Sequence, residues 1–587
     1  MKHFLITVAG VLVGGFILLL LPLFFIIMIG GIASTFSSNE AEISKNTILV
    51  YNLETSVPDY ITNDPMAAFN NAIMGKKNEE VTLRKLQNAI QYATTDENIS
   101  CLVLKGTTSG ASYANMNSIQ QYLKDFKATG KPIYFFDNSI DQSAMYLASN
   151  ADSIFVVPTG TVLMYGLTST RTFYKNAFDK FGIDMQIIRH GKYKSAVEPY
   201  MTDHMSEASR EQTQKYLDAI WNNMREEIAS NRKIDSERID NYVNKLNFAE
   251  LQSAVDIHLI DRCIYRDEFL AMLKQQVGIE PDEDLKTISI EKYSNSVVSD
   301  NISDNQIAVI YAQGEIYDGT ANGDQTNIYG DDLARTIRKA RTDENIKAIV
   351  LRVNSPGGSA LASDVIWREI KLASETKPTV VSMGQYAASG GYYISCAANY
   401  IFAEPTTITG SIGIFGMIPC AKKVANNLGF TFDSVSTSEE GEPTLFEPLS
   451  EGWQNMLQNR IEAGYQTFIS RCANGRHTTT EHIDSIGQGR VWAGVDAMNI
   501  GLVDYLGSLE TAIEYAAQLS HIDDYVVTEL PQADDSFMAL MKQLGMNTRA
   551  SIGRSLFGQS FEEIQKVEKM IEKPSINARM EYDITIY

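Results

Sequence analysis

The stretch that decides the fold is Thr95-Asp-Glu-Asn-Ile-Ser-Cys-Leu-Val-Leu104, which recurs 247 residues later as Thr342-Asp-Glu-Asn-Ile-Lys-Ala-Ile-Val-Leu351. In each copy, an apolar run of strand length follows the shared Thr-Asp-Glu-Asn-Ile sequence. Apolar residues at helical spacing precede it, namely Leu86, Ile90 and Ala93 in the first copy and Leu333, Ile337 and Ala340 in the second. A helix leading into a buried strand therefore occurs twice, which predicts an internal duplication.

The match between the two copies continues outward from this stretch. Lys131-Pro132 and Lys377-Pro378 each open a second apolar strand, and Ile154-Phe155 corresponds to Ile401-Phe402. We therefore expect two similar domains, residues 46–290 and 305–530, joined by a polar linker. Each alternates strands with helices, which predicts an α/β fold with mostly parallel strand pairing.

Composition excludes several classes of protein. The 587 residues are 44% hydrophobic and 21% charged, which is ordinary globular usage and excludes wholesale disorder or a collagen-like chain. The net charge of −22 argues against a nucleic-acid partner, because phosphate binding needs basic surface. The five cysteines form no Cys-x-x-Cys pair, so we expect buried core cysteines and neither a disulfide framework nor a zinc site.

The N-terminal segment predicts a membrane anchor. Residues 4–36 contain no charged side chain. A bilayer needs roughly 20 apolar residues, whereas a cleavable signal has a core of about 7–15. We therefore expect an uncleaved transmembrane helix within residues 1–36. Lys2 precedes it and Glu40 follows it, so the positive-inside rule puts the N-terminus in the cytoplasm and the body outside. A cleaved signal peptide, ending near Ala33-Ser34, is the alternative.

Residues 531–587 lie outside the repeat and form a C-terminal extension. Helix-like spacing over residues 561–571 favours a helix used in packing or assembly over a functional site.

The two copies differ at the positions that carry chemistry. The second has Gly410-Ser411-Ile412-Gly413, whereas Met164 occupies the position of Ser411 in the first copy. Conversely, the first copy alone has Lys194. Because Met164 replaces the serine there, we expect the first copy to be catalytically silent by itself. A lysine can act as the base for a serine nucleophile if it is neutral. Its ordinary pKa of about 10.4 must then be depressed by burial toward about 7–8.

Taken singly, each of these features has an ordinary structural interpretation. Pro356-Gly357-Gly358 is typical of a turn, Gly-Ser-Ile-Gly is typical of a tight loop, and a lone lysine is usually a solvated surface charge. Only their combination, at matched places of a repeat, favours a hydrolytic site.

Four strings together resemble the long, duplicated form of the signal peptide peptidase A family. They are Lys192-Tyr-Lys-Ser-Ala-Val-Glu-Pro199, Arg352-Val-Asn-Ser-Pro-Gly-Gly-Ser359, Ala388-Ser-Gly-Gly-Tyr-Tyr393 and Thr409-Gly-Ser-Ile-Gly-Ile-Phe-Gly416. The resemblance implies two tandem crotonase/Clp-protease-like domains and a serine endopeptidase with a Ser/Lys dyad. It also implies an inner-membrane homotetramer with a periplasmic body that degrades cleaved signal peptides and other short, apolar or unfolded peptides. No metal or cofactor is implied.

The same resemblance assigns roles to individual residues. Ser411 is the expected nucleophile and Lys194 the expected general base. The N–H of Gly358, or of neighbouring Gly357, would stabilise the oxyanion, with the N–H of Ile412 as a second donor.

Ser436 is a candidate hydroxyl for orienting the lysine, with an ordinary loop serine as the alternative interpretation. We assign Ser389-Gly390-Gly391 to close helix packing, without a chemical role.

Three other functions remain open at this stage. His190 lies four residues from Lys194 and could form a Ser/His pair. The same fold also supports acyl-thioester chemistry, as in enoyl-CoA hydratases, but that chemistry needs carboxylates where this chain has Ser411. Finally, the chain could be an inactive, membrane-anchored scaffold that binds peptides.

Overall fold

The computed structural model describes residues 43–61, 80–247, 250–297, 303–321, 326–531 and 576–579. The expected anchor in residues 1–36 lies outside these ranges, as does the expected helix over 561–571. Among the residues described, no helix is both long and apolar enough to cross a bilayer.

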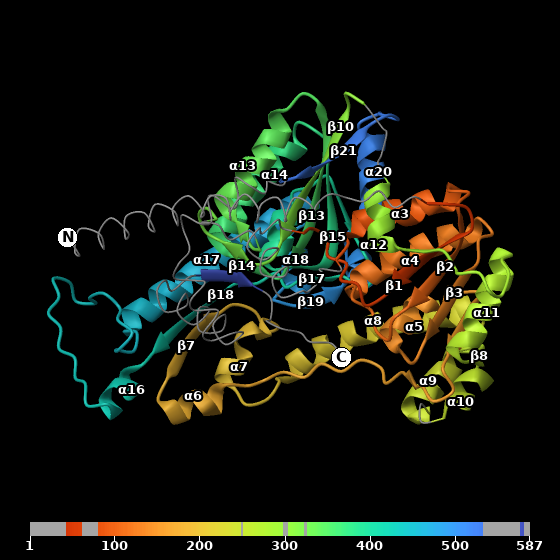
Figure 1. Cartoon of the computed structure of the whole chain (residues 1–587). Helices are drawn as coiled ribbons and strands as arrows, with labels where there is room; N and C mark the ends of the chain where they lie inside the picture. Colours follow the sequence, from red (N-terminus) through yellow and green to blue (C-terminus); the bar gives the residue numbers. More distant parts are fainter. Residues whose placement is uncertain are drawn as a thin grey trace, which may run out of the picture.

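A parallel sheet forms the centre of the first half (Figure 1). Its strand order is β8-β5-β3-β2-β1-β9, and each neighbouring pair is parallel. The strands are β1 (Thr47–Asn52), β2 (Ile99–Lys105), β3 (Ile133–Asp137), β5 (Ser153–Val156), β8 (Arg262–Cys263) and β9 (Thr287–Ser289). The two predicted strands, β2 and β3, are therefore adjacent at its centre.

A second parallel sheet repeats this order as β20-β16-β15-β13-β10-β21. The strands are β10 (Gln306–Gln313), β13 (Ile346–Ser355), β15 (Thr379–Ala388), β16 (Tyr400–Ala403), β20 (Tyr505–Leu506) and β21 (Val526–Leu530). In addition, β15 pairs with β17 (Ile408–Gly410), which pairs antiparallel with β19 (Val491–Ala493). The same succession of strands in both halves agrees with the expected duplication.

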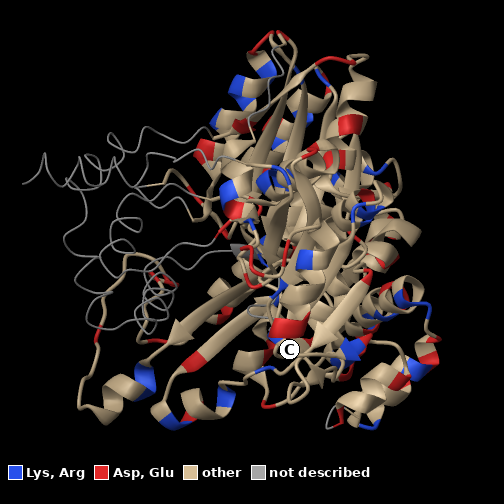
Figure 2. Cartoon of the chain, turned by 45° about the vertical axis from the view of Figure 1, so that its right-hand side comes forward, with Lys and Arg blue, Asp and Glu red and all other residues tan. Residues whose placement is uncertain are grey.

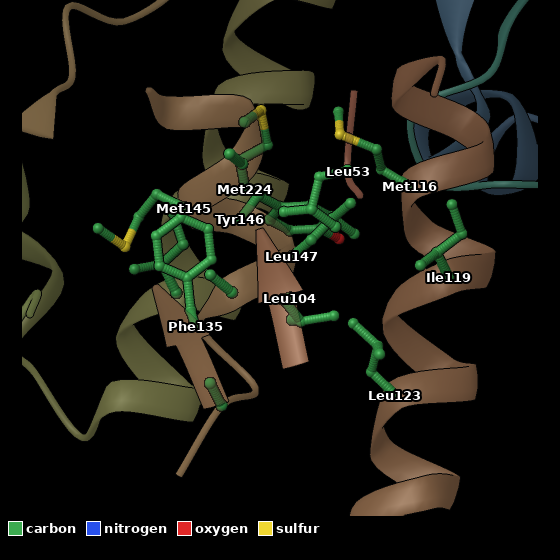
Figure 3. Packing of buried hydrophobic residues seen from close by; sticks show 14 of the residues in the cluster. Leu53, Leu104, Met116, Ile119, Leu123, Phe135, Met145, Tyr146, Leu147 and Met224 are labelled. Atoms are coloured by element: carbon green, nitrogen blue, oxygen red, sulfur yellow. The ribbon is translucent and has the colours of Figure 1, made fainter. Parts of the chain in front are cut away.

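Helices cover both faces of each sheet because alternate strand residues point to opposite sides. In the first half, Leu102 and Leu104 face one apolar cluster, whereas Cys101 and Val103 face another. Figure 3 shows the larger cluster, in which Met116, Ile119 and Leu123 project from one helix toward Leu104 and Phe135. The helices of this half are α3 (Leu83–Thr95), α4 (Tyr113–Ala128), α5 (Gln142–Ala148), α6 (Lys175–Phe181), α7 (Glu198–Met201), α8 (Glu207–Arg232), α9 (Ser236–Asn244), α10 (Leu251–Asp256), α11 (Arg266–Val277) and α12 (Ile290–Ser296).

The second half is layered in the same way. Its helices are α13 (Gly330–Thr342), α14 (Ala360–Ser374), α15 (Gly390–Ser395), α16 (Lys422–Asn427), α17 (Glu451–Gly475), α18 (Thr480–Ile486), α19 (Gly494–Asn499) and α20 (Leu509–Leu519). Apolar residues of α20 cover one face of the sheet, and those of α13, α14 and α17 cover the other. Figure 2 shows that both signs of charge are distributed over the helices and loops around the sheets.

The described part of the polar stretch at the join of the halves, residues 283–297, contains a strand and a helix. Its residues 287–289 form edge strand β9, and Ile290 and Tyr293 of α12 are buried in the first core. The first half therefore extends past residue 290 to the end of α12, because apolar residues interrupt the polar run at helical spacing.

Helix α4 of the first half packs against the second half through buried polar contacts. The Ser118 hydroxyl donates to a Glu404 oxygen, and the Tyr122 hydroxyl donates to Glu510 Oε2 at 2.7 Å. Nearby, the Arg352 guanidinium pairs with the Asp59 carboxylate at 2.8 Å, with both side chains buried. These contacts fix the position of one half against the other.

A third sheet combines strands from both halves and from the C-terminal extension. Its order is β12-β11-β14-β22-β18-β7. The strands are β7 (Asp184–Arg189), β11 (Ile316–Tyr317), β12 (Ile328–Tyr329), β14 (Gly357–Ser359), β18 (Phe415–Cys420) and β22 (Ile576–Arg579). Strand β7 of the first half pairs antiparallel with β18 of the second over six residue pairs.

Candidate active site

Ser411 lies in a tight turn directly after β17. Its backbone has φ of +50°, a left-handed conformation that costs a non-glycine residue roughly 1–3 kcal/mol unless its surroundings hold it. Here the Ser411 N–H donates to the Arg490 carbonyl at 2.7 Å, and only 2% of the residue is exposed. The turn therefore fixes the direction of the hydroxyl.

Lys194 reaches this hydroxyl from the other half of the chain. It follows β7, whose pairing with β18 carries it toward Ser411. The Lys194 Nζ is 3.1 Å from Ser411 Oγ and 3.2 Å from the Ser411 carbonyl oxygen, and the residue is 1% exposed. The structure thus brings together the two residues that the sequence analysis paired, one from each copy of the repeat.

Glycines allow the backbone to close around the lysine. A Cβ on Gly489 would lie 2.6 Å from the Lys194 Cβ, and the φ of Gly489 is +81°. A Cβ on Gly413 would lie 3.3 Å from the Lys194 Cδ and 2.9 Å from the Gly489 Cα. Larger residues at these two positions would displace the lysine stem.

Apolar side chains pack beside the lysine. Ala196, Val197 and Phe415 form a small buried apolar cluster, and the Lys194 Nζ lies 5.9 Å from the centre of the Phe415 ring. Burial of this kind disfavours the charged form of an amine.

Ser389 is a member of this site that sequence reasoning missed. Its Oγ accepts a hydrogen bond from Lys194 Nζ at 2.9 Å, it is fully buried, and its φ is +55°. It follows β15 just as Ser411 follows the adjacent strand β17, and its N–H donates to the Gly410 carbonyl at 2.8 Å. Ser389 thus contacts the lysine directly, which the assignment of Ser389-Gly390-Gly391 to close packing did not anticipate. A second serine at the end of a neighbouring parallel strand was the available signal.

Ser436 is not the partner of the lysine. It lies in an exposed loop, where its Oγ is 3.4 Å from Ser438 Oγ and accepts from the Ser438 N–H. The prediction failed because Val-Ser-Thr-Ser follows no strand of the central sheet, so nothing directs the segment toward Ser411.

The glycine pair that was expected to bind the oxyanion forms the short strand β14. The Gly357 N–H already donates to Ser355 Oγ at 3.2 Å, which leaves Gly358 as the better candidate of the two. A Cβ on Gly358 would lie 2.1 Å from the Ile316 carbonyl oxygen, so only glycine fits there. Ile412 has a buried side chain and follows Ser411 directly, which puts its N–H beside the serine.

His190 and Met164 have no part in this arrangement. The His190 Nδ1 pairs with Glu462 Oε2 at 2.7 Å, and its ring stacks on Tyr465. It is Lys194, not His190, whose nitrogen is within hydrogen-bond distance of Ser411 Oγ. Met164, at the corresponding position of the first half, is fully buried in an apolar core.

Comparison with known proteins gives a consistent result. A model of "Peptidase family S49" matches residues 125–280 and 371–523, once in each half, and a Clp protease model matches residues 312–408. The chain is 37% identical to Protease 4 of Salmonella typhi, over 83% of this chain and 81% of that protein. It is 36% identical to Protease 4 of Haemophilus influenzae, over 86% and 83%. It is 32% identical to a chloroplastic serine protease SPPA of Arabidopsis thaliana, over 82% and 72%. The duplicated unit is thus a Clp-protease-like α/β domain.

Proposed function

Because the chain belongs to peptidase family S49 and is a serine protease, we propose that it is a Ser/Lys dyad endopeptidase with Ser411 as nucleophile and Lys194 as general base. The observation that carries this proposal is the 3.1 Å distance between Lys194 Nζ and Ser411 Oγ in a buried site. A base must lie within hydrogen-bond reach of the proton it removes.

The mechanism begins with a neutral Lys194. Its Nζ takes the proton of Ser411 Oγ, which attacks the peptide carbonyl. The N–H groups of Gly358 and Ile412 stabilise the oxyanion. The lysine then protonates the leaving amine, and a water molecule activated by the same lysine hydrolyses the acyl-enzyme. Ser389 accepts a hydrogen bond from Nζ and holds the amine against Ser411 throughout.

The substrates we propose are cleaved signal peptides and other short or unfolded apolar peptides. We expect such peptides to bind as an extended strand, a recurring mode of peptide recognition. The apolar cluster at Phe415 suits apolar side chains. No Walker A sequence occurs in the chain, which favours substrates that need no ATP-driven unfolding.

We also propose that residues 1–36 anchor the protein in the bacterial inner membrane, with the body in the periplasm, and that it assembles as a homotetramer. The uncharged run of residues 4–36 supports the anchor. Sedimentation of the detergent-solubilised full chain measures the assembly state, for which we expect four copies.

The test is hydrolysis of a fluorogenic signal-peptide-like substrate by the detergent-solubilised full chain. Variants Ser411→Ala and Lys194→Ala should each lose several orders of magnitude in kcat. Exposed Lys192 and exposed Ser436 provide matched controls, and Lys192→Ala and Ser436→Ala should retain wild-type kcat. An inert wild type, or a Ser411→Ala variant that still cleaves, would refute the proposal and favour the peptide-binding scaffold.

A further inference from the structure

A buried glutamine of α8 connects the segment that carries the lysine to the segment that holds the serine. Gln212 lies in the second turn of α8, and only 1% of it is exposed. Its Nε2 donates to the Tyr193 carbonyl at 3.1 Å and to Ser195 Oγ at 2.7 Å, so it binds the residues on both sides of Lys194. Its Oε1 accepts from the Val491 N–H at 3.1 Å. The donor end and the acceptor end of this amide are therefore both in use.

The acceptor end leads directly to the nucleophile. The Val491 N–H belongs to the same peptide unit as the Arg490 carbonyl, which accepts from the Ser411 N–H at 2.7 Å. A continuous line of hydrogen bonds thus runs from the Ser411 N–H, through that peptide unit and the Gln212 amide, to the backbone around Lys194. Hydrogen bonds in such a chain polarise one another, and they are stronger where water is excluded. The nucleophile and the lysine come from different halves, and this line joins their backbones.

Helix α8 is a firm support for the amide. Ser206, its N-cap residue, donates its hydroxyl proton to Glu198 Oε1 of α7 at 2.6 Å, and Glu198 is buried. Farther along the helix, Tyr216 and Ile220 share an apolar core cluster with Val491 of β19. The helix is therefore fixed at its start to α7 and along its length to β19.

A second set of contacts joins the same two segments nearer the surface. The Arg490 guanidinium lies 4.7 Å from the centre of the Tyr193 ring and 4.5 Å from that of Trp492. It also pairs with the carboxylate of Glu211 at 2.8 Å, and 52% of that side chain is exposed. Because water competes with an exposed ion pair, the buried Gln212 amide is the stronger constraint on the geometry.

We propose that Gln212 is a positioning residue, which sets the distance between Lys194 Nζ and Ser411 Oγ by joining the backbones that carry them. The inference rests on the proposed function for its kinetic consequences, but not for the geometry. Gln212 acts through backbone groups and takes no proton in the reaction. A misplacement of about 1 Å between reacting groups can lower a rate by about 10²-fold, so the loss of this amide should be visible in kcat.

The variant Gln212→Met has a side chain of similar length without the amide. We expect kcat for the fluorogenic substrate to fall by about 10²-fold, with KM unchanged, because the amide holds the dyad and not the substrate. Gln214 is exposed on the same helix, so Gln214→Met is the matched control and should retain wild-type kcat. Far-UV circular dichroism gives the amount of folded protein to which each kcat refers. A wild-type kcat in Gln212→Met, or a change confined to KM, would overturn the inference.

Ser195→Ala is a smaller change that tests the same line of hydrogen bonds. It removes one acceptor of Gln212 Nε2 and should lower kcat by about tenfold. The double variant Gln212→Met/Ser195→Ala should have the kcat of Gln212→Met alone, because both changes break the same link. Losses that multiply in the double variant, or a wild-type kcat in Ser195→Ala, would show that Gln212 does not act through this segment and would overturn the inference.

Crystal structures of the full chain separate this inference from the proposed catalysis. In Gln212→Met, we expect the distance between Lys194 Nζ and Ser411 Oγ to increase from 3.1 Å to beyond hydrogen-bond range, about 3.5 Å or more. If the wild type is inert but this distance increases in the variant, the proposed function fails and the inference stands. If the wild type cleaves the substrate and the distance is unchanged in the variant, the proposed function stands and the inference fails. An unchanged distance refutes the inference, whatever the activity.

Discussion

Glu404 provides a quantitative test of how the two halves are joined. It follows β16 of the second half, it is buried, and it accepts a hydrogen bond from Ser118 of α4 in the first half. Burial raises the pKa of Glu404 from 4.5 to about 7, an effect that outweighs the opposing influence of Ser118 and Arg352. The folded protein therefore keeps a proton at a pH where the unfolded chain has released it.

The sign of the pH dependence follows from this difference. Below pH 4.5 Glu404 is protonated in both the folded and the unfolded state, so its titration does not change the free energy of unfolding. As the pH rises from 4.5 toward 7, the unfolded state ionises first, so the native state loses stability. The pKa difference of about 2.5 corresponds to a loss of about 3 kcal/mol, which is complete above pH 7.

The variant Glu404→Gln removes the titration and keeps an oxygen that can accept from Ser118. We compare the free energy of unfolding of Glu404→Gln with that of wild type at each pH. The advantage of the variant should be about 3 kcal/mol larger at pH 8 than at acidic pH, where the titration of Glu404 contributes nothing. Urea denaturation followed by tryptophan fluorescence, in steps of pH, measures the difference. The exposed Glu439→Gln variant is the control. A difference in free energy of unfolding between Glu404→Gln and wild type that is independent of pH, or that grows toward acid, would contradict a raised pKa of Glu404.

Three further predictions concern the site and its support. Ser389→Ala removes an acceptor of Lys194 Nζ and should lower kcat by about tenfold, shift the pH profile of kcat and leave KM unchanged; an unaltered profile would contradict its positioning role. Gly358→Ala would bring a Cβ to 2.1 Å from the Ile316 carbonyl oxygen, which displaces the backbone N–H of residue 358, and should lower kcat/KM by about 10²–10³; an unchanged kcat/KM would contradict a role for the position of this amide. Asp59→Asn leaves the Arg352 guanidinium buried without its carboxylate, so it should reduce the free energy of unfolding by about 3–5 kcal/mol. Urea denaturation measures this loss, and a loss below about 1 kcal/mol would contradict the prediction.

The internal repeat in the sequence was sufficient to predict the central features of the fold and of the candidate site. The duplicated Thr-Asp-Glu-Asn-Ile stretch located the same strand in both sheets, because a buried parallel strand needs a continuous apolar run. The pairing of Lys194 with Ser411 followed from what each copy lacks: Met164 replaces the serine in one half. Their 3.1 Å contact depends on β7 crossing into the second half, a long-range pairing that no local pattern encodes.

The remaining features depend on tertiary contacts that sequence patterns do not specify. Ser389 is beside Lys194 because β15 and β17 are neighbours, and the Ser-Gly-Gly sequence alone is equally suited to packing. Ser436 has the same residue type but lies in an exposed loop. The four residues of β22 form a strand only because β14 and β18 offer two edges, since Ile-Asn-Ala-Arg has no strand pattern of its own.

The most direct measurement of the central claim is covalent labelling of the nucleophile. The full chain is treated with a fluorophosphonate, and the labelled peptide is identified by mass spectrometry. We expect the label on Ser411, a fall in labelling by orders of magnitude in Lys194→Met, and unchanged labelling in Lys192→Met. A label on another serine, or equal labelling of Ser411 in Lys194→Met, would contradict a dyad shared between the two halves.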